Sequence, residues 1–136
     1  MTFSPVVLCV DDDEDDLIFI KEAIDSQPHP FHIEQANDGE QALEFMYRLL
    51  EDRKLPCLVI MDINMPRMNG RKTIEKMKDH PDLARVPVVV FTTSSSEADR
   101  EYFESRGIHF LTKPFDYRNF IKEIIGLLGL CADLNN

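Results

Sequence analysis

The sequence predicts an α/β fold in which a parallel β-sheet is covered by helices on both faces. Five short apolar runs alternate with longer segments of helical period along the chain. Strict alternation of strands and helices is typical of parallel sheets. The runs read as continuous apolar stretches, which indicates strands that are buried on both faces.

The predicted strands are bounded by residues that break regular structure. In order, they cover residues 6–10, 31–35, 58–61, 88–91 and 109–111. The breakers between the predicted elements are Pro28, Pro30, Gly39, Pro56, Pro66, Pro81, Pro87, Gly107 and Pro114.

The predicted helices each follow one of these strands. They cover residues 14–25, 40–51, 71–78, 97–105 and 117–128. The first has one apolar face, formed by Leu17, Ile20, Ala23 and Ile24. Asp13 is the expected N-cap of this helix, and the acidic residues 14–16 suit its N-terminal turn. The last helix has a similar face, formed by Phe120, Ile121, Ile124, Ile125 and Leu128.

The length and composition predict one domain covering residues 1–136, with no output domain. A chain of 136 residues with 43% hydrophobic residues can fill one core. No apolar run approaches the roughly 18 residues of a membrane span, and the first residues lack the pattern of a signal peptide. We therefore expect a cytoplasmic protein. Cys9, Cys57 and Cys131 match neither a disulfide framework nor a zinc site and are expected to be small buried residues.

The charge distribution argues against nucleic-acid binding and against a disordered acidic tail. The formal net charge is -10, and no cluster of Lys and Arg offers a footprint for nucleic acid. The acidic block at residues 11–16 lies between two apolar segments. A block held in this way is not expected to be a loose tail.

Reactive polar side chains stand where four of the predicted strands end. Asp11 and Asp12 follow the first strand, Asp62 the third, Thr92 the fourth and Lys113 the fifth. The carboxyl ends of parallel strands lie along one edge of a sheet. We therefore expect these side chains to converge there.

The expected set of side chains suits phosphoryl transfer to an aspartate. Crowded carboxylates repel unless a cation is present, and oxygen ligands with a phosphate nearby favour Mg²⁺. An ammonium and a hydroxyl suit an anion with several acceptor oxygens. Carboxylates are known nucleophiles in aspartyl-phosphate chemistry, where positioning and charge neutralisation do most of the catalysis.

Each residue alone also has a structural interpretation. Asp11 or Asp12 could cap a helix, Thr92 could bond the backbone at a strand end, and Lys113 could be a solvated surface lysine. The functional interpretation depends on all of them together at matching strand ends.

With these motifs, the sequence resembles the receiver domain of two-component response regulators over nearly its whole length. The matching pieces are Val10-Asp11-Asp12, Asp62-Ile63-Asn64-Met65-Pro66 with Asn69-Gly70, Phe91-Thr92-Thr93, and Lys113-Pro114-Phe115. The resemblance implies a flavodoxin-like (βα)5 doubly wound fold with strand order 2-1-3-4-5. Residues 79–87 also resemble the single-domain receivers that partner phytochrome-type sensor kinases.

The resemblance implies a phosphorelay function with Mg²⁺ as cofactor. Asp62 would be the phosphoacceptor for a sensor histidine kinase or a histidine phosphotransfer protein. Asp12 and Asp62 would bind Mg²⁺ directly, Asp11 would act through water, and Asn64 would offer its backbone carbonyl.

The same resemblance implies a switch that changes protein contacts. Lys113 would pair with a phosphoryl oxygen, and the Lys113–Pro114 bond would be cis, at a cost of about 0.5–1 kcal/mol. Thr92 would move inward to the phosphoryl group, and the Phe110 ring would follow it. The surface around Phe110 would then meet an unknown downstream protein or a second copy of the chain.

Two other functions fit part of the pattern. A phosphatase of the haloacid dehalogenase type also uses a strand-end aspartate, Mg²⁺ and a lysine, but its order of acidic motifs is reversed relative to this chain. A receiver that only binds partners, without phosphorylation, would not need Asp11, Asp12, Asp62, Thr92 and Lys113 all intact.

Overall fold

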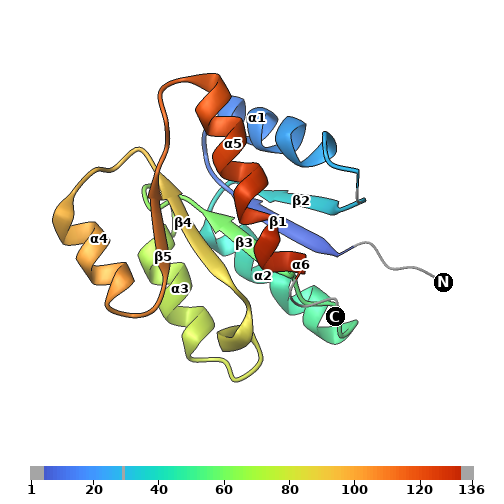
Figure 1. Cartoon of the computed structure of the whole chain (residues 1–136). Helices are drawn as coiled ribbons and strands as arrows, with labels where there is room; N and C mark the ends of the chain where they lie inside the picture. Colours follow the sequence, from blue (N-terminus) through green and yellow to red (C-terminus); the bar gives the residue numbers. More distant parts are fainter. Residues whose placement is uncertain (1–4, 29, 133–136) are drawn as a thin grey trace.

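The predicted architecture is confirmed by a computed structural model, which describes residues 5–28 and 30–132. Five parallel strands form one sheet in the order β2-β1-β3-β4-β5. The helices cover both faces of this sheet (Figure 1). Both the fold class and the strand order therefore agree with the expectation.

The element bounds differ from the predicted ones by a residue at several ends. The strands are β1 (Val6–Val10), β2 (His32–Ala36), β3 (Leu58–Met61), β4 (Val88–Thr92) and β5 (His109–Thr112). The main helices are α1 (Glu14–Asp25), α2 (Gly39–Glu51), α3 (Gly70–Lys78), α4 (Glu97–Glu104) and α5 (Tyr117–Leu127). Two short helices were not predicted, the 3₁₀ turn η1 (Leu83–Arg85) and α6 (Gly129–Ala132).

The sheet has a hydrophobic core on each face because successive side chains of a strand point to opposite sides. In β1, Val7 and Cys9 pack with buried residues of α1 and α5. Leu8 and Val10 of the same strand pack with the core beneath α2, α3 and α4. Figure 1 shows α1 and α5 together on one side of the sheet. Burial on both faces is the reason that the strand sequences read as continuous apolar runs.

The five main helices all begin with a side-chain cap. A carboxylate, amide or hydroxyl oxygen accepts a backbone N–H of the first turn in each case. The capping residues are Asp13, Asp38, Asn69, Ser96 and Asp116. These caps fix the loops at the carboxyl edge of the sheet, where the predicted site lies.

The structure corrects the expectation for two of the cysteines. Cys57 and Cys131 form a disulfide across 74 residues of sequence, joining the start of β3 to α6. Sequence spacing gave no sign of this pair, since only the path of α5 and α6 brings Cys131 to Cys57. Cys9 is a buried free thiol, as expected, and burial with the nearby Asp11 carboxylate raises its pKa to about 12. None of the helices in the described part of the chain is long and apolar enough to cross a membrane.

Candidate functional site

The backbone fixes three site residues directly beyond their strands. The Asp11 N–H donates to Ala36 O (3.0 Å) and the Asp62 N–H to Val10 O (2.9 Å). The Lys113 N–H donates to Thr92 O (2.6 Å). These bonds continue the parallel ladders by one residue, so the three side chains start from rigid positions at one edge of the sheet.

Asp11, Asp12 and Asp62 form an acidic cluster at this edge. One carboxylate oxygen from each lies within 4.8 Å of the others. Asp11 and Asp62 are buried and Asp12 is exposed. An all-oxygen set of this kind suits a hard divalent cation. The convergence predicted from the strand ends is therefore present for all three residues.

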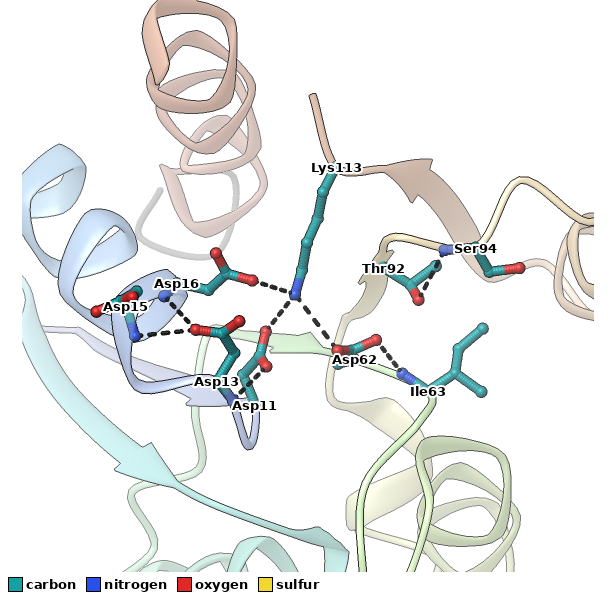
Figure 2. A network of polar contacts seen from close by, with 9 residues as sticks. All are labelled: Asp11, Asp13, Asp15, Asp16, Asp62, Ile63, Thr92, Ser94 and Lys113. Atoms are coloured by element: carbon teal, nitrogen blue, oxygen red, sulfur yellow. Dashed lines mark hydrogen bonds and ion pairs between the residues drawn. The ribbon is translucent and has the colours of Figure 1, made fainter. Parts of the chain in front are cut away.

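The Lys113 ammonium joins two of these carboxylates to a third carboxylate on α1 (Figure 2). Its Nζ donates to Asp11 Oδ2 at 2.7 Å, to Asp16 Oδ2 at 2.6 Å and to Asp62 Oδ2 at 3.3 Å. Asp16 was not predicted as a site residue, because in the sequence it is one of several acidic residues at a helix start. An ammonium has three N–H donors, so all of them have carboxylate partners here.

The electrostatics of the site follow from its burial. Burial raises the pKa of Asp11 to about 6, with a further rise from Asp62, although the charge and hydrogen bond of Lys113 oppose the shift. Burial acts to lower the pKa of Lys113, but the charges of Asp11 and Asp62 outweigh it and raise that pKa. Lys113 therefore stays charged at neutral pH, while Asp11 takes up a proton at mildly acidic pH.

Asp62 is held by both of its carboxylate oxygens. Oδ1 accepts the Ile63 N–H at 2.7 Å, and Oδ2 faces Lys113. The backbone at Gly70 lies very close to the backbone of Asp62. A Cβ atom on Gly70 would be only 2.2 Å from the Asp62 carbonyl oxygen. The Gly70 N–H donates to Ile63 O at 2.8 Å. A glycine at position 70 is therefore required by this close approach of backbone to backbone.

The loop from β3 to α3 is held in place by Asp38, a residue that was not predicted to belong to the site. Asp38 Oδ2 accepts from the Arg67 guanidinium at 2.6 Å, and Oδ1 accepts the Gln41 N–H at 2.9 Å. Burial of Asp38 opposes its charged form, but these two donors together hold its pKa below the usual range. Arg67 has a left-handed backbone (φ 61°), so the ion pair holds a strained position of the loop.

The two predicted switch residues are both buried. The Thr92 hydroxyl accepts the Ser94 N–H at 3.3 Å. The Phe110 ring stacks on Phe103 with centroids 6.1 Å apart, and the Arg100 guanidinium lies 4.9 Å from its centroid. Phe110 is thus already inside the core in this state.

The Lys113–Pro114 bond does not have the isomer that the family resemblance implies. The Lys113–Pro114 bond is trans, because the described residues contain no cis peptide bond; the expectation of a cis bond was wrong for this structure. Trans is the intrinsically favoured isomer of an X-Pro bond.

Asn64 lies two residues beyond Asp62 with its side chain exposed. The role of its carbonyl as a metal ligand stays a prediction.

Comparisons with known proteins agree with this geometry. The family model described as "Response regulator receiver domain" matches residues 7–125. Response regulator Rcp1 of Synechocystis is 31% identical over 127 residues, covering 90% of this chain and 85% of that protein.

Two solved structures share the fold. The Mn²⁺-bound form of response regulator Rcp1 is 29% identical, with a TM-score of 0.83 and 92% of each chain covered. The phosphorylated cyanobacterial phytochrome response regulator RcpA has a TM-score of 0.87, covering 96% of this chain and 95% of that one. At 24% identity, the second similarity shows the fold alone.

Proposed function

Because the chain belongs to the family of response regulator receiver domains, which are phospho-accepting domains of phosphorelays, we propose that Asp62 is its phosphoacceptor. The observation that carries this proposal is the contact between Asp62 Oδ2 and the buried Lys113 ammonium, inside the cluster formed with Asp11 and Asp12. The donor would be a sensor histidine kinase or a histidine phosphotransfer protein. We also propose a cytoplasmic location, as expected from the sequence.

Mg²⁺ is the cation that we assign to the acidic cluster. The donor set fits it, since Asp11, Asp12 and Asp62 offer carboxylate oxygens within 4.8 Å of one another and the Asn64 carbonyl follows in the sequence. The Mn²⁺-bound structure of Rcp1 supports a divalent ion in a relative. When bound, the ion supplies positive charge that offsets the crowded carboxylates and the incoming phosphate.

The chemistry of the transfer needs little from the protein beyond position and charge. A carboxylate oxygen of Asp62 forms the bond to phosphorus as the bond from phosphorus to the donor histidine nitrogen breaks. Oδ2 is the oxygen that faces Lys113, whereas Oδ1 is occupied by the Ile63 N–H. Lys113 places a fixed positive charge where negative charge gathers on the phosphoryl oxygens.

Thr92 and Phe110 are the residues that we assign to the response. The Thr92 hydroxyl accepts a weak hydrogen bond from Ser94 and is free to donate to a phosphoryl oxygen. Because the Phe110 ring is already buried, its response would be a rearrangement against Phe103 and Arg100. Such a shift would alter the surface of α4 and β5 that a downstream protein reads.

Beryllofluoride, a phosphoryl mimic, tests this proposal. With Mg²⁺ present, the wild-type chain should form one adduct, detected by ¹⁹F NMR. Asp62→Asn should form none, and Asp52→Asn, a change at an exposed residue at the end of α2, should behave as wild type. An adduct that survives in Asp62→Asn would contradict the assignment, and rapid turnover of phosphomonoesters by the wild type would favour a phosphatase instead.

A further inference from the structure

Asp16 is the most accessible of the three carboxylates that hold Lys113, although it makes the shortest contact. Its side chain is 18% exposed, compared with 3% for Asp11 and 10% for Asp62. It projects from the first turn of α1 toward the ammonium, which reaches the site from the end of β5 (Figure 2). The Asp16–Lys113 distance is 2.6 Å, and the Asp62–Lys113 distance is 3.3 Å.

We infer that Asp16 is a positioning residue that holds Lys113 in the resting state and releases it when Asp62 is phosphorylated. This inference rests on the proposed function of Asp62. It adds a competition for one lysine between a carboxylate on α1 and the phosphoryl group.

The number of donors on Lys113 is the basis of this competition. All three ammonium N–H groups have carboxylate partners in this state. The bond to Asp62 Oδ2 is released by the transfer itself and supplies the first hydrogen bond to the phosphoryl group. A second bond from Lys113 to the phosphoryl oxygens can form only if the bond to Asp11 or the bond to Asp16 is given up. Loss of the bond to Asp11 would leave a buried charge without its partner, which is costly. Asp16 reaches water, so its carboxylate can be rehydrated at lower cost.

Asp16 should oppose binding of the phosphoryl group but favour binding of the divalent cation. A divalent ion among Asp11, Asp12 and Asp62 repels the Lys113 ammonium, which needs a partner outside the cluster. Asp16 provides one on α1. Without it, Lys113 would rely on Asp11 and Asp62 and would compete with the ion for them.

The test is the variant Asp16→Asn, measured in two binding experiments. At saturating Mg²⁺, its affinity for beryllofluoride should rise about three- to tenfold, because Lys113 no longer has to leave a charged partner. Its affinity for Mg²⁺ alone, measured by calorimetry without a phosphoryl mimic, should fall by a similar factor. A merely structural role would weaken both affinities together.

Asp15→Asn is the matched control, since it removes the same charge from the same turn of α1. Asp15 is exposed, and the three ion pairs of Lys113 do not include it. Asp16→Glu keeps a carboxylate at this position, so its affinities for beryllofluoride and for Mg²⁺ should stay close to those of the wild type. Opposite shifts in Asp16→Asn beyond those of Asp15→Asn support the inference.

A joint fall of both affinities in Asp16→Asn would overturn the inference, and so would either of two further results. If Asp16→Asn and Asp15→Asn give equal values while the wild type still forms its adduct, Asp16 does not position Lys113 and the proposed function stands. If the wild type forms no adduct, the proposed function fails and this inference fails with it.

Discussion

Lys113 and Asp62 meet at 3.3 Å across the carboxyl edge of the sheet, although they are 51 residues apart in the sequence. Each stands directly beyond a strand, Lys113 after β5 and Asp62 after β3, with β4 between them. The remaining donors of Lys113 go to Asp11 and Asp16. One buried cation thus balances carboxylates from the two strands β1 and β3 and from helix α1, and this arrangement has consequences for stability as well as for phosphorylation.

Removal of the Lys113 charge should destabilise the protein when no divalent cation is present. In Lys113→Met, Asp11 and Asp62 would stay buried without a counter-charge, so we expect the free energy of unfolding to fall by about 2–4 kcal/mol. Urea unfolding with and without Mg²⁺ would measure this, and Mg²⁺ should recover part of the loss. Lys122→Met, at an exposed position of α5, is the control. Equal stability of both variants would show that Lys113 does not neutralise the cluster.

Mg²⁺ affinity should depend on pH through Asp11. Its pKa in the folded protein is raised from 3.8 to about 6, so a proton competes with the cation below that pH. The affinity should therefore fall by up to about tenfold per unit as the pH drops below 6. Calorimetry between pH 5 and pH 8 would show this slope, and Asp11→Asn should flatten it. A wild-type affinity that is constant over this range would be evidence against the raised pKa.

The raised pKa of Asp11 also makes the free energy of unfolding depend on pH when no metal is bound. The folded state binds more protons than the unfolded state between the two pKa values, so the contribution of Asp11 favours folding at low pH. This contribution declines as the pH rises from about 4 to about 6 and is constant above.

Asp38 should matter more for stability than its partner Arg67. Asp38→Ala removes both the N-cap of α2 and the ion pair, which together are worth about 2–3 kcal/mol. Arg67→Ala should cost less, about 1–2 kcal/mol, because it leaves the buried Asp38 carboxylate without its ion pair but with the Gln41 N–H still donating to it. Urea unfolding would rank the two variants, with Asp52→Ala as an exposed control. A larger loss of stability in Arg67→Ala than in Asp38→Ala would show that Asp38 is not the main anchor of this loop.

Reduction of the Cys57–Cys131 disulfide should lower stability. The bond closes a loop with a sequence separation of 74 residues, for which the chain-entropy model gives roughly 4 kcal/mol, and 2–4 kcal/mol is typical of measured cases. Unfolding with and without dithiothreitol would measure the difference. Cys57→Ser combined with Cys131→Ser should remove the effect of the reductant, and an unchanged response in this double variant would place the effect elsewhere.

The part of the site that could be predicted is the part set by strand ends. Asp11, Asp62 and Lys113 each follow an apolar run directly, and a parallel sheet brings such positions to one edge. Asp16 could not be singled out, because an acidic residue in the first turn of a helix is also explained by the helix dipole. Only the direction of α1 relative to Lys113 distinguishes it from its neighbours.

The other omissions also depend on distant contacts. Asp38 and Arg67 are 29 residues apart, and the Asp38-Gly39 pair is sufficiently explained by a turn. Cys57 and Cys131 are joined only because α6 follows α5 to the far end of β3. The trans state of the Lys113–Pro114 bond differs from what the family resemblance implied, and no residue pattern in the sequence indicates it.

Phosphorylation by acetyl phosphate in the presence of Mg²⁺, followed by intact-mass spectrometry, shows directly whether Asp62 is the phosphoacceptor. We expect that the wild-type chain gains one phosphoryl group and that Asp62→Asn gains none, while Asp15→Asn is modified as in the wild type. The modification should disappear when Mg²⁺ is removed with a chelator. A phosphoryl group of equal yield on Asp62→Asn, or a wild-type chain that takes up none, would contradict the assignment of Asp62 as the phosphoacceptor.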